Sequence, residues 1–296
     1  MPSLGIKIDM GEFQNKNIAI VCNPLAGVGR AVSLAEKIVT ALTKKQITHS
    51  LFTDKWPVDF NAFTDVWIVG GDGTLNYFIN HYPDIKLPLV IFNGGTGNDV
   101  HWLLYGDKKF DELLELALSA SPKPIDAGQC NERLFINGVG IVFEGAVAES
   151  LIGKKKRSGK ASFMIAVLKK IFFYRSKKYS IHSAEWNEEG RKLMISVTNG
   201  KRVGGGFHIA PAAEADDGLL DVVLIKAISP ILRLHWLPVI EKGKHLALPF
   251  IHHYQTKKIV VESDQLIQYH LDGEAYQSKR LAIEILPSKF LFRYGE

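Results

Sequence analysis

The stretch Val69-Gly70-Gly71-Asp72-Gly73-Thr74-Leu75-Asn76 decides the fold of this chain. The apolar run 66–69 is typical of a short buried strand, and the apolar residues within 75–79 can begin a helix. Three glycines around one carboxylate predict a turn that residues with a Cβ could not all occupy. Its bare N–H groups can approach phosphate oxygens, and Asp72 offers the oxygen ligand that magnesium prefers. The stretch therefore predicts a strand–turn–helix unit that binds phosphate and magnesium.

Two further glycine-bearing turns have the same context. The apolar run 18–22 leads into Asn23-Pro24-Leu25-Ala26-Gly27-Val28-Gly29-Arg30, and the run 87–92 leads into Asn93-Gly94-Gly95-Thr96-Gly97-Asn98-Asp99. The first turn lacks the Lys-Ser/Thr pair of a P-loop and the third glycine of a dinucleotide-binding fingerprint. Asp99 fits a helix N-cap and also a support for magnesium. Three such units in succession predict a parallel sheet with ligands at the carboxyl ends of its strands.

The pattern changes after Pro122-Lys123-Pro124, and we predict a domain boundary near Pro124. Many short apolar runs separated by turn residues follow, which is typical of an antiparallel sandwich or barrel. The expected strands lie at 134–143, 179–186, 192–198, 206–210, 219–225, 258–262, 267–271 and 281–293.

Composition and charge exclude several classes of protein. With 296 residues, 46% hydrophobic and 23% charged, the sequence is that of a folded protein, and no apolar run approaches the ~20 residues of a membrane span. Cys22 and Cys130 give no disulfide framework and are expected to be reduced in a cytosol. The net charge of +5 is mild, and basic patches are not interleaved with aromatic residues, so nucleic-acid binding is not expected. The sequence has neither zinc-like histidine spacing nor a Gly-x-Ser-x-Gly nucleophile elbow.

The motif Gly70 to Thr74 resembles the nucleotide-binding signature shared by diacylglycerol kinases, sphingosine kinases, NAD kinases and phosphofructokinases. Further motifs resemble the lipid kinases, and the resemblance extends from about Ile18 to the C-terminus. These motifs are Asn23-Pro24, Gly95-Thr96-x-Asn98-Asp99, Ile125-Asp126-x-Gly128, Gly204-Gly205-Gly206-Phe207, Asp216-Asp217-Gly218 and Asp272-Gly273-Glu274. The one minor departure is Gly94, where the family more often has leucine. The resemblance implies an ATP- and magnesium-dependent kinase of the diacylglycerol kinase catalytic family, which transfers the γ-phosphoryl group to a lipid hydroxyl.

The resemblance also implies a fold. Residues 1–123 would form a three-layer α/β nucleotide-binding domain around a parallel sheet, completed by C-terminal strands at 285–296. Residues 124–284 would form a β-rich sandwich domain that binds the lipid. The active site would lie in the cleft between the two domains.

The resemblance assigns roles to residues from all of these motifs. Nucleotide binding is expected from the three turns and from Thr53 on the adenine side, through Asn23, Pro24, Gly27, Thr53, Gly70, Gly71, Asp72, Gly73, Thr74, Leu75, Asn76, Thr96 and Asn98. Magnesium would be organised by Asp72, Asp99 and Asp126. Phosphoryl transfer to an alcohol needs a carboxylate near the attacking hydroxyl. Asp272 is expected to be this base, with Glu274 as its partner or substitute.

A second metal site is implied at the Asp217-Gly218 turn. There the Asp217 carboxylate would bind a structural magnesium together with the main-chain carbonyls of Glu214 and Leu219. A metal-free Asp-Gly hairpin turn is the alternative, and the sequence leaves both open.

The basic run 153–160 precedes an apolar segment at 161–168. The two fit a solvated loop with a core helix, or a helix that rests on an anionic membrane surface. Because a lipid kinase must reach a substrate in a bilayer, we expect transient membrane-surface contact by a cytoplasmic protein at the inner membrane. A homodimer is the default oligomer. Diacylglycerol, a sphingoid base, a polyprenol and phosphatidylglycerol all remain open as acceptors.

Two alternative functions are considered. NAD kinase shares Gly-Gly-Asp-Gly-Thr and predicts a dinucleotide acceptor, but it gives no reason for Asp217-Gly218 or for Asp272-Gly273-Glu274. A non-catalytic lipid- or nucleotide-binding protein on the same scaffold would be expected to have lost a carboxylate. The acidic residues Asp72, Asp99, Asp126, Asp272 and Glu274 are all present.

Overall fold

The structure is a computed structural model that describes residues 15–151 and 159–295. Most of the basic run 153–160 therefore lies outside the described residues. Within the described ranges, no helix combines the length and the apolar character that crossing a membrane requires.

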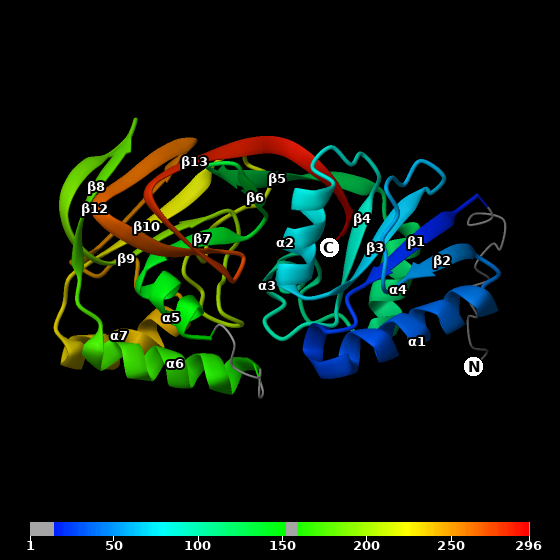
Figure 1. Ribbon diagram of the computed structural model, residues 1–296, viewed down its shortest axis with the longest axis horizontal. Coiled ribbons are helices and arrows are strands. Elements are labelled where there is room, and N and C mark those ends of the chain that lie inside the picture. Colours follow the sequence, from blue (N-terminus) through cyan, green and yellow to red (C-terminus); the bar gives the residue numbers. More distant parts are fainter. Residues whose placement is uncertain (1–14, 152–158, 296) are drawn as a thin grey trace, which may run out of the picture.

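The N-terminal region is built on four parallel strands in the order β2-β1-β3-β4 (Figure 1). The strands are β1 (Asn17–Cys22), β2 (Thr48–Phe52), β3 (Asp65–Gly70) and β4 (Leu89–Asn93). A 3-10 turn (Ala26–Gly29) and the helices α1 (Arg30–Lys44), α2 (Asp72–His81), α3 (Asp99–Tyr105) and α4 (Phe110–Ser119) accompany them. Every residue of β3 is buried, as expected for a strand covered on both faces. The three predicted strand–turn–helix units are therefore confirmed.

The C-terminal region is an antiparallel, sandwich-like array of strands, with three helices among its described residues. Its strands are β5 (Pro122–Cys130), β6 (Arg133–Phe135), β7 (Gly138–Val142), β8 (Lys177–Ser183), β9 (Asn187–Thr198), β10 (Leu220–Lys226), β11 (Ile251–Thr256) and β12 (Lys258–Leu271). Its helices are α5 (Phe143–Leu151), α6 (Gly159–Phe173) and α7 (Pro230–Glu241), which gather on one side of the strands in Figure 1. The strand order runs β11-β10-β9-β7-β12, and β8 pairs with both β9 and β12.

One long strand joins the two regions. β13 (Glu274–Arg293) forms a hairpin with β12, pairs with β5, and ends beside β4 in a parallel pairing of Phe292 with Leu89 (Figure 1). Arg293 at its end forms an ion pair with the buried Asp65 at the start of β3. The strands of both regions therefore belong to one hydrogen-bonded network.

The structure corrects the prediction of a single strand at 134–143. This segment forms two strands, β6 and β7, with a break at Ile136 and Asn137. The N–H groups of Ile136, Asn137 and Gly138 donate to the carboxylate of Asp272. The strand is interrupted because the backbone at this point binds a side chain.

Three other predicted strands also differ. Residues 206–210 form turns, with an isolated bridge between Val203 and Phe207, and the preceding glycines Gly204 and Gly205 have φ values of 63° and 76° that a strand does not adopt. The segments 258–262 and 267–271 belong to the single strand β12, which has a register shift between them.

Candidate active site

A cleft of about 1650 Å³ is lined by residues of both regions. It brings together the ends of β1 and β3, the start of α2, the turn after β4, and the hairpin between β12 and β13. Of the residues singled out in the sequence, Asn23, Pro24, Gly27, Thr53, Gly71, Asp72, Gly73, Thr74, Asn76, Thr96, Asp99, Asp272 and Glu274 line this cleft. Motifs that are up to 250 residues apart in the chain therefore converge on one cavity.

The three glycine-bearing turns pack backbone against backbone. A Cβ on Gly95 would lie 2.3 Å from the Cα of Gly71, and a Cβ on Gly27 would lie 2.1 Å from the carbonyl oxygen of Gly94. Gly27 also has φ +60°, a conformation that favours glycine. These positions need glycine, because a Cβ would prevent the close approach of the turns.

Polar side chains connect the turns to one another. The Asn23 amide at the end of β1 donates to the Thr74 hydroxyl in the first turn of α2, at 3.1 Å. Arg30 donates from Nε to the Gly27 carbonyl at 3.1 Å and from Nη2 to the Gly95 carbonyl at 2.5 Å. Sequence analysis missed Arg30, because nothing in its local sequence indicates a contact 65 residues away.

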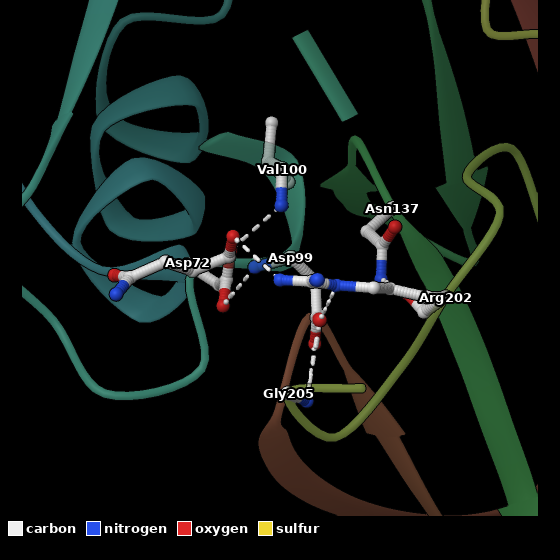
Figure 2. A network of polar contacts seen from close by, with 7 residues as sticks. Asp72, Asp99, Val100, Asn137, Arg202 and Gly205 are labelled. Atoms are coloured by element: carbon white, nitrogen blue, oxygen red, sulfur yellow. Dashed lines mark hydrogen bonds and ion pairs between the residues drawn. The ribbon is translucent and has the colours of Figure 1, made fainter. Parts of the chain in front are cut away.

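Asp72 and Asp99 form the centre of a polar network (Figure 2). The Asp72 carboxylate accepts the N–H groups of Asp99 and Val100 at 3.1 and 3.0 Å, which are the first N–H groups of α3. Asp99 in turn accepts Arg202 Nε at 2.8 Å and the N–H of Gly205 at 2.9 Å. The network thus joins the turns after β3 and β4 to the glycine-rich loop 204–206 of the other region.

Burial raises the pKa of Asp72, although the N–H groups of Val100 and Asp99 lower it. For Asp99, burial and the neighbouring Asp72 raise the pKa to about 7, against the N–H of Gly205 and the charge of Arg202. Two neighbouring carboxylates repel each other when both are ionised, so a state with two negative charges is disfavoured here. A cation bound beside them would relieve this repulsion.

Asp272 is the most heavily hydrogen-bonded carboxylate of the cleft. It is 6% exposed and accepts the N–H groups of Ile136, Asn137 and Gly138 and the amide of Asn76, at 2.9 to 3.1 Å. It occupies the two-residue turn between β12 and β13, where both Asp272 (φ 47°) and Gly273 (φ 90°) are left-handed, as in a type I′ hairpin. Burial raises the pKa of Asp272 to about 6, although its donors lower it.

Glu274 differs from Asp272 in its exposure and in its hydrogen bonding. It is exposed to the cleft, and its side chain makes no hydrogen bond to the part of the chain that the structure describes. A Cβ on Gly73 would lie 2.6 Å from Glu274 Oε1, so this carboxylate lies directly over the first turn of α2. The glycine at position 73 therefore makes room for an acidic group from the opposite region.

Asp126 lies apart from the cleft. Its two carboxylate oxygens accept the N–H groups of Gly218 and Ser288, both at 2.7 Å, and it does not line the cavity. It thereby ties the Asp217-Gly218 turn to a bend in β13. Asp126 is placed as a link between loops and not beside Asp72 and Asp99, where sequence analysis expected it to organise magnesium.

At the Asp217 turn itself, the Asp217 carboxylate accepts the N–H of Leu219 at 2.9 Å and contacts Gln255 at 3.3 Å. Burial, Asp221, Asp126 and Glu214 raise the pKa of Asp217, although the N–H of Leu219 lowers it. The Leu219 N–H closes the turn, and binding of a metal through Asp217 and the carbonyls of Glu214 and Leu219 stays a prediction.

Three other residues proposed for nucleotide binding do not line the cleft. Leu75 is fully buried in the core, Gly70 ends β3 where a Cβ would collide with Thr74, and Asn98 precedes α3 with φ 54°. Conversely, Lys55, Trp56, Arg202, Glu144 and His270 line the cleft or hold its acids, and sequence analysis did not identify them. They come from loops, from strand β12 and from helix α5, and they lie outside the motifs that the resemblance assigned to the site.

The donor set fits a magnesium ion carried by a nucleotide. The described residues contain no cluster of three or more His, Cys, Asp or Glu side chains that could hold a metal alone. Asp72 uses one lone pair of each oxygen for N–H groups, which leaves further positions for a ligand. Magnesium is commonly bound by one or two carboxylates together with substrate phosphates. Asp72 is the residue that would hold it, with Asp99 fixed behind it.

Comparison with known proteins matches both regions to the family of lipid kinases that the sequence motifs resemble. Residues 17–130 match the diacylglycerol kinase catalytic domain, and residues 139–291 match the YegS C-terminal NAD kinase beta sandwich-like domain. A protein of Shewanella frigidimarina named "Probable lipid kinase YegS-like" is 31% identical over 77% of this chain and 75% of its own length. One of the same name from Yersinia pestis is 31% identical over 76% of this chain and 77% of its own.

Solved structures share the fold. A Bacillus anthracis structure assigned as a diacylglycerol kinase superposes with a TM-score of 0.76 at 24% identity, covering 95% of this chain and 97% of that one. The curated relatives and the two family matches, which span the cleft from β1 to β13, agree with the lipid-kinase motifs. The chain therefore belongs to the YegS-like lipid kinase family, with an N-terminal region of the diacylglycerol kinase catalytic type.

Proposed function

We propose that this protein transfers the γ-phosphoryl group of ATP to the hydroxyl of a lipid, with magnesium as cofactor. The observation that carries the proposal is the convergence of Asp72 and Asp99 with Asp272 and Glu274 around one cleft. The first pair comes from the region with the phosphate-type turns, and the second from a hairpin of the opposite region. This arrangement supports phosphate binding on one wall and an acceptor on the other.

ATP is proposed to bind along the turns at Asn23, Gly71 and Thr96. The N–H groups of the close-packed glycines and the positive end of α2 suit its phosphates. Trp56 and Thr53 line the same end of the cleft and offer surfaces for the base. Asp72 would hold magnesium, which neutralises phosphate charge when it is bound.

The acceptor hydroxyl must lose its proton to a carboxylate. Asp272 already receives four N–H donors, about as many as a carboxylate has lone-pair positions. Glu274 has these positions free and lies over the first turn of α2. We therefore propose that Glu274 accepts the proton and that Asp272 fixes the hairpin, which reverses the order expected from the sequence.

Contact with a membrane surface is supported by the exposed side chains of α6 and α7. Half of the large apolar side chains that the described residues expose lie on these two helices: Ile165, Leu168, Phe172, Phe173, Ile231, Leu232 and Leu234. Lys169 and Lys170 of α6 line the cleft beside them. We propose that this face rests on an anionic lipid surface, so that an acceptor can enter the cleft from the bilayer.

The test is a phosphorylation assay with labelled ATP and vesicles made from a bacterial lipid extract. We expect a labelled product that gains one phosphate by mass, and at least a ~1000-fold lower rate for Asp72→Asn. The substitution removes one charge of a repelling pair and is expected to leave the fold intact. Transfer by Asp72→Asn at the wild-type rate would exclude the proposed role of Asp72, and phosphorylation of NAD instead of lipid would exclude the proposed acceptor.

A further inference from the structure

A second group of polar side chains lies on the acceptor wall of the cleft. Gly140 of β7 pairs with His270 of β12 on one side and with Ser196 of β9 on the other. Because Gly140 has no side chain, the polar ends of two neighbours fill the space above it. A Cβ at this position would lie 2.1 Å from His270 Nε2 and 2.4 Å from Glu144 Oε2. Glu144 and His270 line the cleft together with Asp72 and Asp272.

These polar atoms lack partners within the described residues. Glu144 is 8% exposed, yet its Oε2 takes part in no hydrogen bond within the described residues. The N–H of Gly273 donates to His270 Nδ1 at 3.3 Å, so the neutral imidazole carries its proton on Nε2. This Nε2–H makes no hydrogen bond to the described part of the chain. A buried polar atom without a partner costs about 1 to 3 kcal/mol, which a suitable ligand would recover.

The charge state of the pair indicates what kind of ligand it suits. Burial raises the pKa of Glu144 to about 8, and the Ser196 hydroxyl only partly offsets this. Burial lowers the pKa of His270 to about 4. Both groups are therefore neutral near pH 7, and together they offer hydrogen-bond donors and acceptors without charge. Such a pair suits a hydroxyl, whereas an ammonium group would need Glu144 to ionise in a buried position.

We propose that Glu144 and His270 form a specificity subsite that binds a second hydroxyl group of the acceptor headgroup, next to the hydroxyl that is phosphorylated. His270 lies two residues before Asp272, so the subsite adjoins the hairpin that carries Asp272 and Glu274. The inference rests on the proposed lipid kinase activity and names its substrate class as lipids with a polyol headgroup. Glu144 and His270 position and select the acceptor, and they take no part in the proton transfer.

The test uses three acceptors of equal chain length in mixed micelles: a long-chain primary alcohol, the vicinal diol, and the 2-amino alcohol. The full chain should show a kcat/KM for the diol that exceeds that for the primary alcohol by about 10- to 100-fold. Glu144→Leu and His270→Phe should each reduce this ratio to near one. Glu144→Gln keeps the shape and the hydrogen-bonding capacity without the acid, and its ratio should stay within about threefold of wild type.

Glu149→Gln is the matched control, because Glu149 is a carboxylate of the same helix, α5. Its oxygens accept the amides of Gln268 and Gln277, and it does not line the cleft. The ratio of this variant should equal that of wild type. Glu144→Leu should melt no lower than wild type, because it removes an unpartnered polar group. If Glu144→Leu does not fold, the diol-to-alcohol ratios of kcat/KM for His270→Phe and Glu144→Gln still test the subsite.

The outcomes separate this inference from the proposed function. A wild-type ratio near one, with good transfer to the primary alcohol, overturns the subsite and leaves the lipid kinase assignment intact. Preference for the amino alcohol, or loss of diol preference in Glu144→Gln, shows that a charged carboxylate is needed and also overturns it. Absence of transfer to these acceptors and to the lipid extract contradicts the proposed function itself.

Discussion

Asp272 and Glu144 are two buried carboxyl groups of the same cleft, and they have opposite surroundings. Asp272 is 6% exposed and receives four N–H donors, whereas Glu144 is 8% exposed and leaves Oε2 without a partner. Burial raises the pKa of both, to about 6 for Asp272 and to about 8 for Glu144. The number of donors is the main difference, since each donor favours the ionised form.

A carboxyl group that holds the fold differs from one that is kept for a ligand in the number of donors that it already binds. A carboxylate saturated by backbone N–H groups has no capacity for another partner. A buried carboxyl group without partners lowers stability, and its presence in a cleft is explained by a ligand that binds there. Asp126 accepts one N–H group on each oxygen, from Gly218 and Ser288, and it holds loops outside the cleft. Glu274 makes no hydrogen bond to the described residues, so it resembles Glu144 in having free acceptor positions, although it is exposed.

The largest effect is expected from Asp272→Asn, which tests the saturated class. An amide has a single acceptor oxygen and would turn its NH2 group toward backbone N–H donors. We expect a loss of about 2 to 4 kcal/mol in the free energy of unfolding and at least a ~1000-fold lower rate of transfer. Urea denaturation and the labelled-ATP assay measure the two effects. A variant with wild-type stability would show that the four N–H groups do not depend on the charge.

Glu274→Gln tests the unsaturated class. Because Glu274 makes no hydrogen bond to the described residues, we expect the melting temperature to stay within about 1 °C of wild type. The rate of phosphoryl transfer should fall by about 100- to 10,000-fold, as expected for loss of a general base. Asp264→Asn, at an exposed position of β12, is the control and should leave both quantities unchanged. A variant of Glu274 that keeps full activity would return the role of base to Asp272.

Asp126→Asn tests a carboxylate that accepts two N–H groups but does not line the cleft. We expect the free energy of unfolding to fall by about 1 to 3 kcal/mol, since two buried N–H groups lose a charged acceptor. The rate per folded molecule should stay within about threefold of wild type. A large loss of rate with little loss of stability would instead place Asp126 in the magnesium site expected from the sequence.

The smallest effect concerns the pH dependence of stability. The folded-state pKa of Glu144 lies above its ordinary value, so the folded protein keeps a proton that the unfolded chain releases above about pH 4.5. The contribution of Glu144 to stability therefore falls as the pH rises from about 4.5 to 8. Glu144→Gln should remove this fall. The free energy of unfolding of the variant, relative to wild type, should be higher at pH 8 than at pH 5 by on the order of 2 kcal/mol. Denaturation at the two pH values measures this. If the difference in the free energy of unfolding between Glu144→Gln and wild type were the same at pH 5 and pH 8, the proposed protonation of Glu144 would be contradicted.

Much of the fold and part of the site could be predicted from sequence, for identifiable reasons. The turn at Gly70–Asn76 is readable because close backbone packing against Gly95 admits only glycine, which leaves a local sequence pattern. Asp272-Gly273 is readable as a hairpin turn for a different reason, because both residues have the positive φ that an Asp-Gly pair adopts. The family resemblance predicted that these two motifs face one cleft. Their spacing in the sequence alone does not predict this.

The remaining features depend on contacts between distant parts of the chain. Arg202 reaches Asp99 across 103 residues, and no local pattern distinguishes it from a surface arginine. Asp126 sits in a family-like motif, but its donors come from Gly218 and Ser288, so its position was not readable from its neighbours. The break between β6 and β7 depends on where Asp272 lies, and the apolar run that contains it gives no sign of it.

The course of β13 has a consequence for biosynthesis. During translation, β4 emerges with β3 on one side, but its other neighbour comes from residues near Phe292, about 200 residues later. Until then the nascent protein has an unprotected apolar sheet edge, a feature that invites association with other chains. The N-terminal region therefore matures only after the C-terminal region has been synthesised, and a ribosome that stalls before β13 would release an aggregation-prone product.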